Sequence, residues 1–293
     1  MKIRTIAKIA GALVALVLLT LIALPLLISA DFLKAQLVAQ VKKTTGRELI
    51  IRGNTSLTLF PQIAVSAEDV TLGNPDGFAS EYFVHIDKLQ TGAALGPLLS
   101  HELKITGITL EGAVLNLEQL GSGAKNWEFT AEKVKQEAAK SAQKSAAESS
   151  PLKSFALGDV KISRSAIRYF QPNAKPLAVN DIDVTISGAD GTSPLQVTGS
   201  AQYRDEQVQA QVWIEKIRDF LAGKPSKLTA KIDVPNGLVR FSGTGRMGEQ
   251  LGGEGKFEAS IADLPALLSW ANGLPAAPGL PKKLEVQSDI TLA

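Results

Sequence analysis

The chain has 293 residues and no cysteine, which excludes disulfides, thiolate nucleophiles and cysteine-ligated metals. Its 31 Lys and Arg residues nearly balance 29 Asp and Glu residues, for a formal net charge of +2, so the charge gives no indication of a nucleic-acid partner. Aromatic residues make up only 5% of the chain, so any core must be aliphatic, and nothing in the composition points to an enzyme.

The N-terminus predicts a membrane anchor over residues 1–30. Three cations at positions 2, 4 and 8 precede an uncharged apolar run from Ile9 to Ile28. At about 1.5 Å per residue, a helix of this length matches a hydrocarbon core of about 30 Å. The cations favour a cytoplasmic N-terminus, so the bulk of the chain is expected across the membrane. A cleaved signal peptide is the alternative, although Ile28-Ser29-Ala30 is a mediocre cleavage site.

Residues 31–130 predict a helix followed by a β domain. Four apolar residues between Asp31 and Gly46 fall at helical spacing, with Asp31 as the N-cap and Gly46 as the stop. From Leu49 the apolar period changes to two, and a β-hairpin is expected around the turn Gly53-Asn54, closed by Pro61. Further short strands are expected at Ile63–Val65, Val70–Leu72, Phe83–Leu89 and Leu103–Leu117.

Residues 131–151 have a different composition, rich in Ala, Lys, Ser and Glu. The stretch contains good helix formers but no apolar stripe, so it lacks a face that could pack on another element. We interpret it as a flexible linker between two β regions, the second of which spans residues 152–293.

Two ungapped internal repeats indicate a repeating β architecture. Residues 103–117 align with residues 155–169, and each copy predicts a strand, a break, a strand, a small-residue turn and a strand, with alternation in each limb. Residues 214–221 align with residues 261–268, and each copy predicts a short helix directly after a strand. Asp263 is placed to cap the second of these helices.

Strands of the second region alternate strictly between apolar and polar residues. Val208, Ala210, Val212 and Ile214 share one face of a strand, with three glutamines and Trp213 on the other. This pattern predicts an antiparallel sheet with one wet face. The apolar side must be covered by a second sheet, a closed barrel, packed helices or a ligand, and the short helices expected here are too few to cover so many strands. Either a sandwich or a groove for an apolar molecule is therefore expected.

Several short stretches occur in an order that is typical of one protein family. They are Thr45-Gly46-Arg47, Leu57-Thr-Leu-Phe60-Pro61, Glu68 to Phe78 with its Asn74-Pro-Asp-Gly77, Gly96 to Ser100, Leu115-Asn-Leu-Glu118, Asn126-Trp127, Gly243-Thr-Gly245 and Ala262 to Trp270. The chain resembles the bacterial AsmA family through them. That resemblance implies an inner-membrane-anchored, periplasmic protein of outer-membrane biogenesis, related to bridge-like lipid-transfer proteins. It implies a curved β-sheet whose apolar trough takes phospholipid as its partner.

The fold expected is thus mainly β with short helices, an N-terminal transmembrane helix and a curved antiparallel sheet built of repeats. The lipid-binding candidates are Leu110, Leu115, Leu117, Ile162, Ile167 and Tyr169. The alternative is that each belongs to an ordinary sheet core. The family stretches also have structural interpretations, with Gly46 as a helix stop, Asn74 to Gly77 as a turn and Trp127 as a core plug.

No constellation for catalysis or metal binding stands out. The two histidines, His85 and His101, have no metal-ligand spacing around them, and His85 is expected to be exposed on a strand. The glycines at 243–245 and 252–255 lack the lysine and long helix of a P-loop and fit strand bends better. We therefore expect no catalytic residues, no metal and no cofactor. A periplasmic hydrolase would need a polar cluster that the sequence does not offer.

Two hypotheses for function remain. The first is phospholipid binding or transport along an apolar β groove, with the inner membrane as a further partner through the anchor. The second is a non-enzymatic envelope scaffold that assists outer-membrane protein assembly and recruits protein partners through β-edges. The last residues, Leu284 to Ala293, alternate like the start of a strand, and the family likeness leads us to expect a longer protein in which further strands follow.

Overall fold

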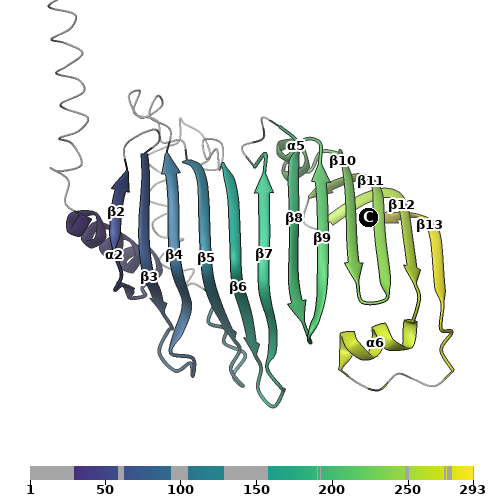
Figure 1. Ribbon diagram of the computed structural model, residues 1–293, viewed down its shortest axis with the longest axis horizontal. Helices are drawn as coiled ribbons and strands as arrows, with labels where there is room; N and C mark the ends of the chain where they lie inside the picture. Colours follow the sequence, from purple (N-terminus) through teal and green to yellow (C-terminus); the bar gives the residue numbers. More distant parts are fainter. Residues whose placement is uncertain are drawn as a thin grey trace, which may run out of the picture.

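The computed structural model describes residues 30–58, 63–93, 105–128, 158–189, 191, 193–247, 251–273, 275 and 279–292. These residues form one open 13-stranded sheet and three short helices (Figure 1). The first half comprises α2(Ala30–Thr45), β1(Leu49–Ile51), β2(Thr55–Thr58), β3(Ile63–Gly73), β4(Tyr82–Ala93) and β5(Ile105–Glu118). The second half begins with β6(Asp159–Phe170), β7(Leu177–Ser187), β8(Leu195–Tyr203), β9(Glu206–Ile214) and α5(Ile217–Leu221). It continues with β10(Ser226–Val234), β11(Gly237–Met247), β12(Leu251–Ile261), α6(Leu264–Asn272) and β13(Leu284–Leu292).

From β3 to β13 the strands lie in chain order, and each pairs with the next. All described neighbours are antiparallel except β5 and β6, which run parallel. The predicted antiparallel sheet is therefore confirmed for the other strand pairs, and the parallel pair β5 and β6 is the exception. Parallel neighbours need a connection of about a dozen residues or more, because the chain must return to the same end of the sheet. The predicted linker, residues 131–151, falls in this connection and lies outside the described residues.

The predicted hairpin around Gly53-Asn54 is wrong. β1 and β2 do not pair with each other, because both pair with β3 and together form one interrupted edge strand. At the interruption, the Gly53 N–H donates to the Glu68 carbonyl, and the Glu68 N–H donates to the Asn54 carbonyl. A Cβ at Gly53 would lie 2.7 Å from that same carbonyl oxygen, so the glycine permits a close backbone approach here rather than a chain reversal.

The first repeat coincides with the parallel pairing. Leu110 lies opposite Ile162, Leu115 opposite Ile167, and the same ungapped alignment that relates the two copies is the register of β5 with β6. Equivalent positions of the repeat are thus direct neighbours in space. Because directly opposite residues share a face, the repeated pattern places the same kinds of side chain side by side and extends one face of the sheet.

A row of irregular residues crosses the sheet from β3 to β7. Asp69 in β3, Gly112 in β5, Arg164 in β6 and Asp181 in β7 all have positive φ angles, between 46° and 63°. The registers place these residues next to one another, and Asp87 of β4 lies in the same row between Asp69 and Gly112. Such bulges bend a strand and shift its alternation by one residue, so the whole row acts as a fold line in the sheet.

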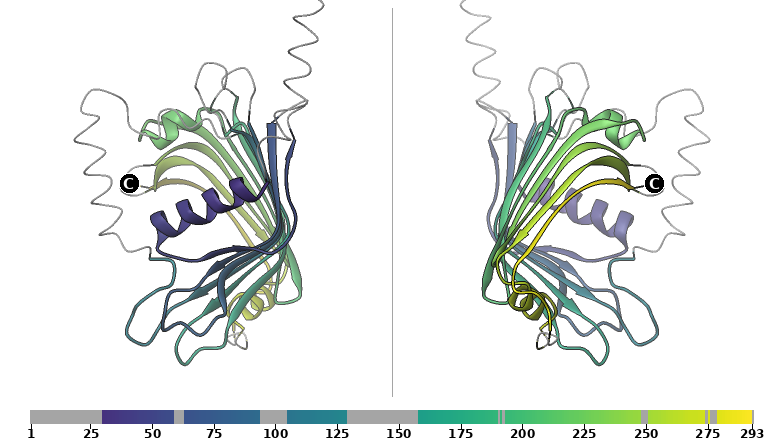
Figure 2. Two further views of the ribbon diagram at one scale, coloured as in Figure 1. Left: turned by 90° about the vertical axis from the view of Figure 1, so that its left-hand side faces the viewer. Right: turned by 90° about the vertical axis from the view of Figure 1, so that its right-hand side faces the viewer.

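The sheet is strongly curved, and α2 lies inside the curve (Figure 2). α5 and α6 lie at opposite ends of the strands (Figure 1), α5 after β9 and α6 after β12. This confirms the second repeat, in which a short helix follows a strand. Asp263 caps α6 through a 3.0 Å hydrogen bond from the Ala266 N–H to its carboxylate, as expected.

No helix in the described part of the chain is both long and apolar enough to cross a membrane. The predicted anchor, residues 1–30, lies outside the described residues except for Ala30 at the start of α2.

Candidate functional site: the concave apolar face

The exposed large apolar side chains of the strands lie on one face of the sheet. Sheet partners that lie directly opposite each other share a face, and the registers connect these residues through such pairs from β6 to β13. This face is the concave one. The helix α5 lies on the concave side of the sheet (Figure 2), and its Phe220 packs against this face beside Leu228 and Gly245. The strand residues of this group are Ile167, Leu177, Ile232, Met247 and Val286, which are 36% to 42% exposed. Several large apolar side chains exposed on one face are typical of an interaction surface.

All six predicted lipid-binding residues lie on this concave face. They form three direct pairs across β5 and β6, namely Leu110 with Ile162, Leu115 with Ile167 and Leu117 with Tyr169. The bulges at Gly112 and Arg164 make this possible, because without them residues 110 and 115 would point to opposite faces. Tyr169 lies at the edge of the group, where its ring meets Trp127 edge-on at 5.9 Å and its hydroxyl bonds to Gln119.

The middle of the concave face has no cover among the described residues. The buried apolar residues gather in three places: near β1, the middle of β3 and the start of β4; at the end of β9 and α5; and at the end of β12. They are Ile51, Ala67, Val70, Phe83, Ile214, Phe220, Ala259 and Ile261. No described apolar side chain of β5, β6, β7 or β8 is buried. A closed sandwich would bury these central strands most deeply, so the described residues do not form the sandwich, and the curved apolar face stays open.

Two helices border the groove at its second half. Phe220 of α5 is buried, and its ring lies where a side chain at Gly245 would point. At the other end of the strands, the indole of Trp270 in α6 donates a 2.9 Å hydrogen bond to the Tyr203 carbonyl, and the two rings meet edge-on at 5.5 Å. Both helices therefore fix the rims of the groove and leave its floor to the strands.

A polar cluster centred on Asn126 secures the N-terminal end of the groove. Asn126 is fully buried, and its side-chain amide donates to Asn74 Oδ1 at 2.9 Å and to the Asn116 carbonyl at 2.8 Å. Its Oδ1 accepts from the Glu118 N–H at 2.8 Å, and its own carbonyl accepts from the Arg47 guanidinium. Arg47 is itself buried beneath the Phe83 ring, directly after the end of α2. The cluster thus ties α2 to the ends of the strands.

Glu118 is the acidic member of this cluster. Its carboxylate accepts hydrogen bonds from the Ala79 and Ser80 N–H groups, at 2.8 and 3.0 Å, and from the Ser80 hydroxyl at 3.0 Å. Burial alone would raise the pKa of Glu118, but these three hydrogen bonds outweigh it and hold the pKa below its usual value. The carboxylate therefore stays ionised while it fixes the loop between β3 and β4.

Four of the stretches that carry the family resemblance meet in this cluster, through Arg47, Asn74, Asn116 with Glu118, and Asn126. Gly46 ends α2 with φ 74° and Gly77 lies in a turn, as predicted. Trp127 is only half-buried, whereas its neighbour Asn126 is the buried plug. No periodicity in the sequence assigns these residues to one another.

The described residues contain no group of three or more His, Asp or Glu side chains able to hold a metal ion. His85, expected to be exposed, is half-buried, with 27% of its side chain exposed. It bonds to Thr71 Oγ1 at 3.0 Å and lies 3.4 Å from an Asp87 oxygen. The glycines at 243–245 and 252–255 lie opposite one another on β11 and β12, as strand glycines. His101 lies outside the described residues.

The fold defines a class of protein, an open and strongly curved β-sheet with an exposed apolar face. The AsmA family profile matches residues 2–247, so the chain belongs to the AsmA family. Protein AsmA of Escherichia coli strain K12 is 33% identical over 95 residues, which is 32% of this chain and 15% of that protein. The matched segment thus covers less than two thirds of its relative. Membership of the family suggests a role in the cell envelope and in outer-membrane biogenesis.

Proposed function

We propose that this protein is anchored in the inner membrane and binds phospholipid in the periplasm, carrying acyl chains along the concave apolar face. The observation that supports this most directly is the row of exposed Ile167, Leu177, Ile232 and Val286 on a single uncovered face. An apolar ligand that covers these side chains removes them from water, which lowers the free energy of the complex.

The dimensions of the groove suit a lipid. Ten interstrand steps separate β3 from β13, and at about 4.8 Å per step the trough is about 48 Å long. Each buried methylene contributes about 0.8 kcal/mol, so an acyl chain can be held without any catalytic or metal centre. The headgroup can remain in water at the rim, because the trough is open along its length.

Phospholipid that co-purifies with the full chain tests this function. Leu115→Asp and Ile167→Asp each place a charge in the trough, and both should abolish co-purified phospholipid and its transfer between vesicles. Gln209→Asp and Thr185→Asp add the same charge to exposed positions on the opposite face and should leave both unchanged. A folded, lipid-free protein that transfers no lipid would refute the proposal.

The scaffold hypothesis is the alternative, and it requires that a strand edge of the sheet stays open in the whole protein. Among the described strands β13 pairs only with β12, and most of its side chains are exposed. A strand edge with free backbone groups can recruit a partner by β-augmentation. A stable protein partner crosslinked through β13, in the absence of any bound lipid, would favour this hypothesis over lipid binding.

A further inference from the structure

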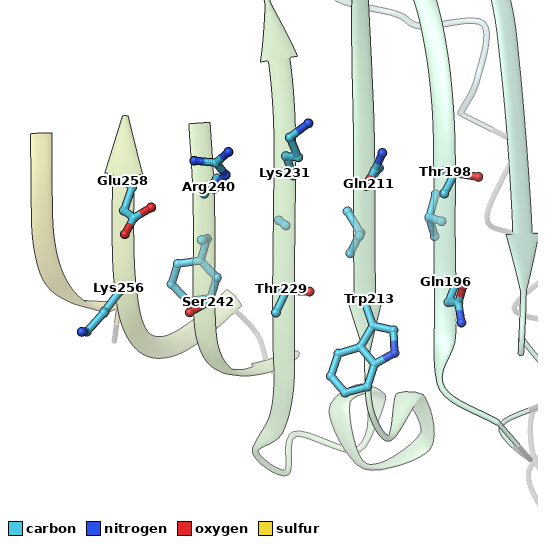
Figure 3. Close-up of a pocket in the computed structure, with 14 residues that line it drawn as sticks. Gln196, Thr198, Gln211, Trp213, Thr229, Lys231, Arg240, Ser242, Lys256 and Glu258 are labelled. Carbon is cyan, nitrogen blue, oxygen red and sulfur yellow. The ribbon is translucent and has the colours of Figure 1, made fainter. Parts of the chain in front are cut away.

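The convex face of the second half carries a cavity of about 480 Å³ across β8 to β12 (Figure 3). Its floor is formed by Val197, Val212, Ala230 and Phe241, whose side chains belong to the concave face. The cavity is therefore separated from the apolar trough by one layer of backbone. It is not used by the proposed lipid function.

Two cross-strand rows line this cavity. In the first row each residue lies directly opposite the next: Gln196, Trp213, Thr229, Ser242 and Lys256. Thr229 and Ser242 are short, so the Trp213 ring stands beside a depression rather than against another large side chain (Figure 3). Trp213 is the aromatic residue of a strand whose other residues on this face are glutamines.

The second row runs parallel to the first and consists of Thr198, Gln211, Lys231, Arg240 and Glu258, again as direct partners. One end of the cavity thus offers amides and hydroxyls, which both donate and accept hydrogen bonds. The other end offers three cations, counting Lys256 of the first row, against one acid. Asp233, which is not part of the lining, pairs with Lys231 Nζ at 2.7 Å, so with Glu258 two acids stand against the three cations and the end of the cavity keeps a net positive charge.

An aromatic ring beside amides and hydroxyls is suited to a ring ligand with an apolar face and polar edges. An exposed arginine next to a lysine is suited to a carboxylate or phosphate, which the guanidinium can bind with two hydrogen bonds. A sugar ring that carries an acidic group meets both requirements. A bilayer surface fits less well, because the cavity offers Trp213 alone for insertion.

We propose that this cavity binds an anionic oligosaccharide, with a sugar ring on Trp213 and an acidic substituent at Lys231 and Arg240. The cavity and the trough can then be occupied at the same time, one on each face of the same strands.

Binding of tetragalacturonate to the full chain in detergent, measured by thermophoresis at low and high salt, tests this inference. We expect saturable, salt-sensitive binding that Trp213→Ala and Arg240→Gln each weaken about tenfold or more. Gln209→Ala on the same strand and Arg168→Gln, a second exposed arginine, serve as matched controls and should bind normally. Trp213→Phe should retain part of the affinity, which separates loss of stacking from misfolding.

Three results would overturn the inference: no binding of tetragalacturonate, equal binding of neutral maltotetraose, or binding that neither Trp213→Ala nor Arg240→Gln reduces. Tighter binding to phosphatidylglycerol vesicles, with the same dependence on both residues, would assign the cavity to a membrane surface instead. Phospholipid co-purification is expected to survive both substitutions, so a failure here leaves the trough proposal unaffected.

Discussion

Leu115 of β5 and Ile167 of β6 are direct partners across the parallel strand pair of the sheet, and they are also equivalent positions of the internal repeat. Both face the trough, and Ile167 is 37% exposed. When a strand pairs with its own repeat copy, apolar residues of the two copies lie next to each other. The apolar face is lengthened in this way by the same aliphatic contacts.

The bulge row is needed to keep the apolar residues on one face, and Gly112 is its most constrained member. Gly112 has φ 63°, and a Cβ there would lie 1.9 Å from an Asp87 carboxylate oxygen. We expect Gly112→Ala to lower the free energy of unfolding. The left-handed backbone conformation alone costs an alanine about 1–2 kcal/mol, and the clash of its Cβ with Asp87 adds to this loss. Thermal or urea unfolding measures this.

Two variants make that measurement specific. Gly121→Ala has open space around its Cβ position and should leave stability unchanged. Adding Asp87→Ala to Gly112→Ala removes the closest contacts and should recover part of the loss. Equal stability of Gly112→Ala and the unchanged chain would contradict the role given to the bulge row.

The alternation of apolar and polar residues predicted which side chains share a face of the sheet better than it predicted where strands are interrupted or irregular. Val208 to Ile214 form a regular strand, and the predicted apolar face is the observed one. The irregular positions could not be anticipated, because a positive φ is uncommon at any residue other than glycine, and nothing in the alternation marks Asp69, Arg164 and Asp181 as the places where it occurs. Gly53-Asn54 has the residue types of a turn, but it interrupts an edge strand, because the strands on both sides of it pair with β3.

Asn126 holds the cluster that ties α2 to the sheet. Asn126→Ala removes three side-chain hydrogen bonds and leaves buried partners unsatisfied, each at about 1–3 kcal/mol. We expect a large loss of stability, of about 3 kcal/mol or more, and faster hydrogen exchange in α2. Asn272→Ala, at the exposed end of α6, is the control. Unchanged exchange in α2 would show that Asn126 does not secure it.

Glu118 should make the stability of the protein depend on acid pH. Its pKa in the folded state lies below its usual value of 4.5, so the ionised form stabilises the fold. This contribution is fully present above pH 4.5 and is lost as the pH falls through the lower folded value.

Melting temperatures of the unchanged chain and of Glu118→Gln, measured from neutral to acid pH, test this dependence. Glu118→Gln should be less stable at neutral pH, and the difference should shrink as the pH falls below 4.5. Glu206→Gln, at an exposed position, should follow the unchanged chain throughout. A difference that stays constant with pH would contradict the ionised role of Glu118.

Alternation accounts for only part of the shared face. A period of two puts Leu115 with Leu117 and Ile167 with Tyr169, whereas the irregular positions at Gly112 and Arg164 bring Leu110 and Ile162 onto the same face. The Asn126 cluster and the Trp213 cavity were not predictable. They join residues from different elements, and the register between strands decides which of them meet.

The measurement that tests the central proposal most directly uses the absence of cysteine in the chain. A single cysteine at Ile167 or Ile232, labelled with a benzophenone, would face the trough, whereas one at Arg168 or Lys231 would face away on the same strand. After irradiation in inner-membrane preparations, we expect phospholipid adducts by mass spectrometry at 167 and 232 and none at 168 and 231. Adducts at 168 and 231 with none at 167 and 232, or no lipid adduct at any of the four, would contradict the assignment of the concave face to lipid.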